Sequence, residues 1–256
     1  YHYFSRLSSG SVFSPEFPRP LVIAFNVVMG TVIFLAMFQI ALDVASLTVA
    51  LFTGHFPMLV PEVRYAAGLA ALCLSGFAVN RAIIVPPLKD IEIAIPGLAK
   101  EFDGYRIVQL TDLHISRLFP AAWTEAMVAK TNALGTDLIV ITGDFIDGSL
   151  ENRRADVEPL RRLSASDGIY AISGNHEYFF DAEAFLRHFK AMGMQLLSNS
   201  HAVIERGAAK LVVAGVPDRS AVRHGFAAPD LAAALEGAPD RAPVILLDHQ
   251  PMNART

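Results

Sequence analysis

The sequence predicts an α/β domain that follows two membrane-spanning helices, and three observations support this fold class. Before residue 90 the chain holds two apolar runs that are each long enough to cross a membrane. After Lys89, short apolar runs alternate with segments whose apolar residues recur at helical spacing. Several of those short runs are followed within two residues by aspartate, asparagine or histidine. Strands that alternate with helices indicate a sheet covered by helices.

Composition agrees with this division of the chain. Hydrophobic residues make up 53% of the 256 residues and charged residues 18%, with a mean hydropathy of +0.39. These values are too apolar for an ordinary soluble domain. The net charge of −4 gives no sign of a nucleic-acid-binding surface. Cys73 is the single cysteine, so an intramolecular disulfide is excluded and the redox compartment stays open.

A polar flank is followed by two candidate membrane spans. Residues 21–42 are apolar except for three polar side chains, and a helix of this length crosses the ~30 Å hydrocarbon layer. The apolar character continues to Phe52, so this helix can extend or bend beyond Asp43. Residues 66–85 form the second candidate span. We therefore expect a flanking segment (1–19), a two-span region (20–88) and a globular domain (89–256).

The apolar runs fit buried core helices or a signal peptide less well than membrane spans. A pair of buried core helices would carry a more amphipathic pattern, and a signal peptide would be a single run followed by a small-residue cleavage pattern. Arg6 and Arg19 precede the first span and Arg81 and Lys89 flank the end of the second, whereas the intervening loop offers only Arg64. This charge bias favours the cytoplasm for both flanks and for the globular domain.

The globular domain is expected to alternate strands and helices. The expected strands are 90–95, 105–110, 138–142, 169–173, 210–216 and 244–248, and the expected helices are 121–134, 156–163, 181–192 and 229–235. The run at 138–142 is continuously apolar, which favours a buried strand. Asp181 is expected to be the N-cap of the helix that follows it.

Candidate metal ligands follow four of the expected strands. Asp112 and His114 are two residues apart, so on an extended chain their side chains point the same way and can reach one cation. Gly143 lets the backbone come close before Asp144, whose carboxylate can bridge two metals. Asn175 offers a carbonyl oxygen and His249 an imidazole to a second metal.

These residue types suit hydrolysis at phosphorus. Two cations about 3.5–4 Å apart can hold a hydroxide and clamp a phosphoryl oxygen. His176 follows Asn175 and need not bind metal itself. Asp147 can orient its imidazole and raise the imidazole pKa, so that His176 protonates the leaving group near neutral pH.

Each piece alone also fits a purely structural role. Asp-X-His and Gly-Asp occur in turns, Asn175 can cap a helix, and His249 can be a core histidine. The order of the four pieces, each after a strand, is much more specific. We interpret Glu177 as a structural hydrogen-bond acceptor. The remaining histidines are expected on the surface or in loops: His2, His55, His188, His201 and His224.

The order of these motifs resembles the calcineurin-like metallophosphoesterase superfamily over about residues 90 to 256. The family pattern is Asp-X-His, Gly-Asp, Gly-Asn-His-Asp/Glu, a lone His and Gly-His-X-His, and this chain supplies the first four. The spans make the chain most similar to the bacterial membrane-associated branch, which includes UDP-2,3-diacylglucosamine pyrophosphatase-like enzymes. The resemblance implies a β-sandwich flanked by helices with a site for two divalent metal ions. The aspartate, histidine and asparagine ligands suit manganese, iron or zinc about equally well. The resemblance implies that Asp112 and His114 bind the first metal, that Asp144 bridges the two metals, and that Asn175 and His249 bind the second. It also implies that His176 is the proton donor and that Asp147 is its acidic partner.

Gly-His-X-His does not follow His249 within the chain, and we interpret this as C-terminal truncation. The expected protein is an integral, membrane-anchored phosphoesterase of the bacterial inner membrane, which splits a phosphoester or pyrophosphate bond through a metal-bridging hydroxide. The anchor makes a lipid-linked substrate such as UDP-2,3-diacylglucosamine attractive, because enzyme and substrate would share one plane. A catalytically inactive membrane scaffold or sensor is the alternative. Oligomeric state stays open, and no nucleic-acid partner is expected.

Overall fold

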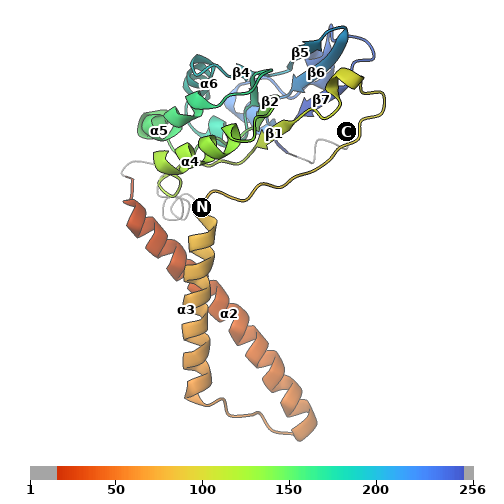
Figure 1. Cartoon of the computed structure of the whole chain (residues 1–256). Coiled ribbons are helices and arrows are strands. Elements are labelled where there is room, and N and C mark those ends of the chain that lie inside the picture. Colours follow the sequence, from red (N-terminus) through yellow and green to blue (C-terminus); the bar gives the residue numbers. More distant parts are fainter. Residues whose placement is uncertain (1–15, 251–256) are drawn as a thin grey trace. The chain divides into compact units, whose positions relative to one another are not determined.

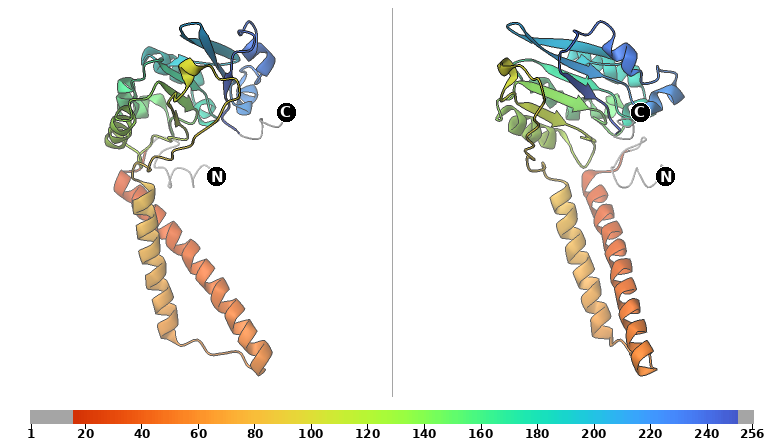
Figure 2. Two further views of the ribbon diagram at one scale, coloured as in Figure 1. Left: turned by 45° about the vertical axis from the view of Figure 1, so that its right-hand side comes forward. Right: turned by 90° about the vertical axis from the view of Figure 1, so that its right-hand side faces the viewer.

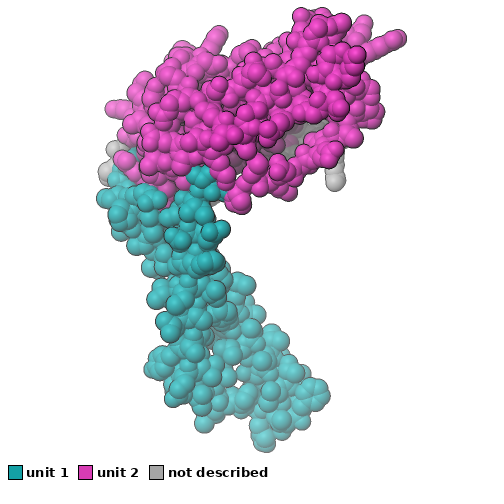
Figure 3. All heavy atoms as spheres, in the orientation of Figure 1, with its two compact units in different colours: residues 1–86 teal, residues 87–256 magenta. Residues whose placement is uncertain are grey.

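The computed structural model describes residues 16–250, so most of the expected flanking segment lies outside the described residues. The chain divides into two compact units, Tyr1–Pro86 and Pro87–Thr256, which Figure 3 colours separately. The first unit holds the two apolar helices and the second holds both β-sheets.

The first unit contains helices α2 (Arg19–Thr53) and α3 (Pro61–Ala82), both labelled in Figure 1. Both are long and apolar enough to cross a membrane by length and composition. The first helix extends well past Asp43, whose carboxylate accepts a hydrogen bond from Gln39 Nε2 at 2.7 Å one turn earlier. The second begins earlier than expected, at Pro61, because proline suits the first helical turn, where its missing N–H has no partner to lose.

The second unit is built on two sheets, as Figures 1 and 2 show. The first sheet is entirely parallel and has the order β1 (Ile107–Leu110), β2 (Leu138–Thr142), β3 (Ile169–Ile172), β4 (Gln195–Leu196). The second has the order β5 (Ser200–Arg206), β6 (Ala209–Gly215), β7 (Val244–Leu247), with β5 antiparallel and β7 parallel to β6. The expected two-sheet α/β architecture with flanking helices is therefore confirmed.

The core lies between the two sheets. Leu138 and Val140 of β2 pack in one cluster with Val213 of β6 and Leu247 of β7. Ile139 and Ile141 alternate with the β2 core residues and are also fully buried, so β2 is covered on both faces, as its continuous apolar run predicted.

Helices cover the outer faces of the sheets. The helices beside the first sheet are α4 (Ala121–Asn132), α5 (Leu150–Val157) and α6 (Ala182–Ala191), and α7 (Leu231–Leu235) packs on β5 and β6. Short 3-10 helices complete the unit: η1 (Lys100–Phe102), η2 (Glu158–Arg162), η3 (His176–Phe179) and η4 (Arg219–His224). Asp181 caps α6 as predicted, since its carboxylate accepts the N–H of Ala184 at 2.9 Å.

Two sequence predictions of secondary structure were wrong, and two strands, β4 and β5, were not predicted. Residues 90–95 form no strand, and Ile91 and Ile93 are 68% and 74% exposed. Alternation of polar and apolar residues does not by itself supply a neighbouring strand with which the backbone can form hydrogen bonds. The helix expected over 156–163 begins at Leu150, where Ser149 caps it, and becomes 3-10 around Pro159, which lacks an N–H. Strand β5 was not predicted, because its polar and charged residues obscure the alternation that indicates a strand. In the structure it pairs with β6 along its full length.

Candidate metal centre

The carboxyl ends of β1, β2 and β3 meet at one edge of the parallel sheet, and each carries candidate ligands. Asp112 and His114 follow β1, Asp144 follows β2, and Asn175 and His176 follow β3. His249 follows β7 of the other sheet, so its approach depends on how the two sheets pack. The structure brings all of these predicted site residues into one cluster.

Backbone hydrogen bonds hold the first two loops side by side. The N–H groups of Asp112, His114 and Ile115 donate to the carbonyls of Gly143, Asp144 and Phe145 at 3.2, 3.0 and 2.9 Å. Asp112, His114 and Asp144 have φ values of +51°, +42° and +53°. Non-glycine residues rarely adopt this left-handed conformation, and such residues cluster at functional sites.

Two glycines allow the second and third loops to touch. A Cβ on Gly143 would collide with the backbone of Gly174, and a Cβ on Gly174 would collide with Asp144. Gly143 also has a φ of +94°, which favours glycine. The Gly-Asp and Gly-Asn pairs therefore bring the Asp144 carboxylate directly beside the loop that carries Asn175.

Glu177 joins the same two loops through its side chain. Its buried carboxylate accepts the backbone N–H of Asp144 at 3.0 Å, of Phe145 at 2.8 Å and of Gly174 at 2.8 Å. The prediction that Glu177 is a structural acceptor is confirmed. Burial and the neighbouring Asp144 charge raise the pKa of Glu177 more than its three N–H donors lower it.

Asp144 lies at the centre of the cluster and is only 3% exposed. Its Oδ2 is 3.5 Å from Nε2 of His249 and 3.6 Å from Nε2 of His114. Ligand atoms of Asp112, Asp144 and His249 all lie within 4.8 Å of one another. Asn175 belongs to the same group, because its Oδ1 is 3.0 Å from His249 Nε2.

This donor set fits divalent metal ions. Carboxylate oxygens, an amide oxygen and imidazole nitrogens are ligands that manganese, iron and zinc accept. The two carboxylates, Asp112 and Asp144, concentrate negative charge that favours a cation there. The hydrogen bond to Asp144 outweighs burial and raises the pKa of His249 to about 9. Burial would raise the pKa of Asp144, but His249 and the N–H of His176 lower it overall.

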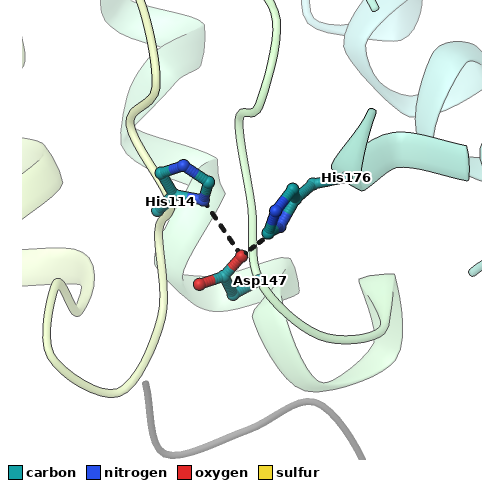
Figure 4. A group of neighbouring side chains, drawn as sticks. All are labelled: His114, Asp147 and His176. Carbon is teal, nitrogen blue, oxygen red and sulfur yellow. Dashed lines mark hydrogen bonds and ion pairs between the residues drawn. The ribbon is translucent and has the colours of Figure 1, made fainter. Parts of the chain in front are cut away.

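Beside this group, Asp147 contacts two imidazoles, as Figure 4 shows. Its Oδ1 is 2.6 Å from Nδ1 of His176 and 3.1 Å from Nδ1 of His114. Burial would raise the pKa of Asp147, but the hydrogen bonds of the two histidines lower it to about 2. Burial would lower the pKa of His176, but the hydrogen bond and charge of Asp147 raise it overall.

Sequence reasoning missed the groups that support the ligands. The carbonyl of Thr142 accepts a hydrogen bond from Nδ1 of His249 at 2.8 Å. Arg153 is fully buried, and its Nε donates to the carbonyl of Asp147 at 2.9 Å while Nη1 contacts Asp156 at 3.0 Å. A main-chain carbonyl and a buried arginine within a helical segment belong to no sequence motif, so no signal in the sequence could have identified them.

Among residues 16–250, the remaining histidines play no part in the cluster. His201 contacts the carbonyl of Ala234 at 2.9 Å, and His224 stacks on Tyr178 with ring centroids 6.1 Å apart. His55 is exposed, and His188 belongs to α6. His2 lies outside the described residues.

One protein family and several known proteins are similar to this chain. The calcineurin-like phosphoesterase family matches residues 105–255. A protein of Danio rerio named "Transmembrane protein with metallophosphoesterase domain" is 32% identical over 188 residues, which are 71% of this chain and 43% of that protein. An "Uncharacterized metallophosphoesterase" of Helicobacter pylori is 31% identical over 171 residues, which are 67% of this chain and 44% of that protein.

Among solved structures, the NAD nucleotidase of Haemophilus influenzae has a TM-score of 0.44 and 18% identity, covering 59% of this chain and 35% of that one. The chain spans less than half the length of the two curated relatives described above, at 43% and 44%.

Proposed function

The chain belongs to the calcineurin-like phosphoesterase family, and from this premise we propose that it is a membrane-anchored, metal-dependent hydrolase of phosphoester or pyrophosphate bonds. One observation carries the proposal: ligand atoms of Asp112, Asp144 and His249 converge within 4.8 Å, next to the Asp147–His176 pair. A cluster of this kind can hold cations while a separate imidazole remains free for proton transfer.

We propose that Asp112 and His114 hold one divalent cation, that Asn175 and His249 hold another, and that Asp144 contacts both. When bound, such cations supply positive charge that activates a water molecule and neutralises charge developing on phosphorus. The ligand set suits manganese, iron and zinc about equally well. Asp144 suits the shared position because its Oδ2 faces both His114 and His249, at 3.6 and 3.5 Å.

The proposed proton donor is His176. Its Nδ1 contacts Asp147 at 2.6 Å, which leaves Nε2 as the nitrogen that can give a proton to the leaving oxygen. The raised pKa keeps the imidazole protonated closer to neutral pH, as a general acid requires. Asp147 remains ionised and so supports the imidazolium form until the proton leaves.

We also propose that α2 and α3 anchor the protein in a bacterial inner membrane, with the globular domain on the cytoplasmic side. The support is the length and apolar surface of both helices and the positive residues outside the loop that joins them. An anchored enzyme would meet a lipid-linked phosphate or pyrophosphate by diffusion in the plane of the membrane. This location makes a lipid-linked substrate the class that we propose.

The proposal is tested by assaying the intact protein in detergent micelles with Mn²⁺ against three substrates. These are an aryl phosphate, a lipid-linked pyrophosphate and a soluble nucleotide pyrophosphate. We expect hydrolysis that disappears in Asp144→Ala and a higher kcat/KM for the lipid-linked compound. Preference for the soluble nucleotide would contradict the lipid-linked substrate, and hydrolysis that persists in Asp144→Ala would contradict the site. Metal binding without hydrolysis of any phosphoester would favour the alternative function, a catalytically inactive membrane scaffold or sensor.

A further inference from the structure

We propose that Asp147 is a positioning residue for two imidazoles, so that one carboxylate oxygen orients both the metal ligand His114 and the proton donor His176. The role of His176 rests on the proposed function, whereas the role of His114 concerns metal binding alone. Asp147 would therefore link two parts of the site that the sequence motifs place in separate blocks.

The geometry of the three side chains carries this inference. Both contacts end on the same atom, Oδ1 of Asp147, at 3.1 Å from His114 and 2.6 Å from His176. The two rings lie nearly at right angles, with an interplanar angle of 77° and centroids 4.5 Å apart (Figure 4). A carboxylate oxygen has two lone pairs, so it can accept one N–H from each ring.

The shared contact decides which nitrogen of each ring faces the centre of the site. With Nδ1–H donated to Asp147, the free nitrogen of each imidazole is Nε2. Nε2 of His114 lies 3.6 Å from Asp144 Oδ2 and 3.9 Å from Asp112 Oδ1, among the other proposed ligands. Nε2 of His176 lies 3.9 Å from the same oxygen of Asp144.

The main chain holds Asp147 in place for this task. Its N–H donates to the carbonyl of Ile115 at 3.0 Å, directly after His114, and Ile115 also forms a bridge with Ile146. The buried Arg153 contacts the carbonyl of Asp147 at 2.9 Å. The Asp147 side chain is 12% exposed, so water cannot easily take over its role as acceptor.

Two roles for Asp147 can be separated by experiment. If Asp147 serves His176 alone, its removal slows hydrolysis and leaves metal affinity unchanged. If it also orients His114, its removal weakens metal binding as well, by about 10- to 100-fold, as is typical for a residue that orients a ligand. Removal of His176 should then leave metal affinity unchanged, because Asp147 still holds His114.

The test is calorimetric titration of Mn²⁺ into the intact, metal-free protein in detergent micelles. Wild type is compared with Asp147→Ala, Asp147→Asn and His176→Ala, and kcat with an aryl phosphate is measured in parallel. We expect weaker Mn²⁺ binding in Asp147→Ala, partial rescue in Asp147→Asn because its amide oxygen still accepts an N–H, and unchanged binding in His176→Ala. Wild-type affinity in Asp147→Ala would overturn the proposal.

Two controls keep the result interpretable. Asp230→Ala removes a carboxylate that caps α7, with an N–H from Ala233 at 3.0 Å, and should leave Mn²⁺ affinity unchanged. If Asp147→Ala fails to fold, Asp147→Leu fills the same space without an acceptor, and its Mn²⁺ affinity decides the question in the same way. A wild type that binds Mn²⁺ but hydrolyses nothing would contradict the proposed function, while the Mn²⁺ titrations would still decide the role of Asp147.

Discussion

The carboxylate of Glu177 accepts the backbone N–H of Asp144 at 3.0 Å, so a buried side chain from the third loop positions the central residue of the second. The same carboxylate accepts the N–H of Phe145 and of Gly174 at 2.8 Å each. Both loops that carry central ligands therefore depend on one side chain, which accepts three backbone N–H groups.

Glu177→Gln should destabilise the protein and weaken metal binding together. A glutamine offers one acceptor oxygen, and its NH₂ group would face a backbone N–H that is left unpaired. The cost of a buried unpaired donor is about 1–3 kcal/mol. The check is chemical unfolding of the metal-free protein, followed by Mn²⁺ titration. Glu183→Gln, at a side chain that is 66% exposed, is the control. Equal unfolding free energies for both variants would contradict the role of Glu177.

Metal affinity should fall as the pH falls from 9 to 7. The pKa of His249 in the metal-free protein is about 9, so the imidazole is protonated below that pH and must lose a proton to become a ligand. Asp144 has a lowered pKa and stays ionised across this range. We expect about a tenfold weaker apparent affinity per pH unit for the proton displaced at His249. Titration calorimetry in two buffers of different ionisation enthalpy counts that proton, and a pH-independent affinity would show that His249 is not a ligand.

Arg206→Met should destabilise the second unit and make its unfolding free energy depend less on pH in acid. The guanidinium contacts Asp137 at 2.6 Å and Asp167 at 3.0 Å, and it lies 4.6 Å from the ring centroid of Tyr105. It therefore joins β5 to the segments that precede β1, β2 and β3. These groups are partly exposed, so we expect a loss of about 1 kcal/mol. Arg187→Met, whose pair with Glu183 is exposed, should change stability much less.

The pH dependence at Asp137 has a definite sign. Burial would raise the pKa of Asp137, but the N–H of Arg106 and the guanidinium of Arg206 lower it overall. A group with a lowered folded-state pKa stabilises fully above its unfolded pKa of about 3.9, and this contribution is lost as the pH falls through the folded-state value. Urea unfolding between pH 6 and 3 should show a smaller acid loss in Arg206→Met than in wild type. Identical losses would mean that the ion pair does not act on Asp137.

Gly30→Leu should separate the two apolar helices. A Cβ on Gly30 would collide with Ser75, whose hydroxyl donates to the carbonyl of Val27 at 2.7 Å across the pair. Close backbone approach at small residues is the usual basis of helix association in membranes. The measurement is the amount of SDS that must be added to the protein in detergent micelles to separate the two helices. Gly68→Leu is a matched control, because a Cβ there meets nothing within 4 Å. Equal SDS resistance of the two variants would contradict the predicted contact.

Much of the fold could be predicted because its signals are local. The continuous apolar run at 138–142 became β2 with the same bounds, since a strand buried on both faces needs no alternation. Alternation at 90–95 produced no strand, whereas Ser200–Arg206, with weaker alternation, pairs along its full length with β6. Pairing depends on a neighbouring backbone, and a short sequence pattern does not contain that neighbour.

The amino-acid sequence by itself determined the two apolar helices and the order of ligand-type residues after the strands, because both follow from composition and spacing along the chain. Only the tertiary structure decided that His249 joins from the second sheet, that Glu177 holds two loops, and that His114 and His176 share one oxygen of Asp147. Those contacts join residues that are far apart in the sequence. They exist because the two sheets pack face to face and the loops meet at one edge, which no local pattern of residues encodes.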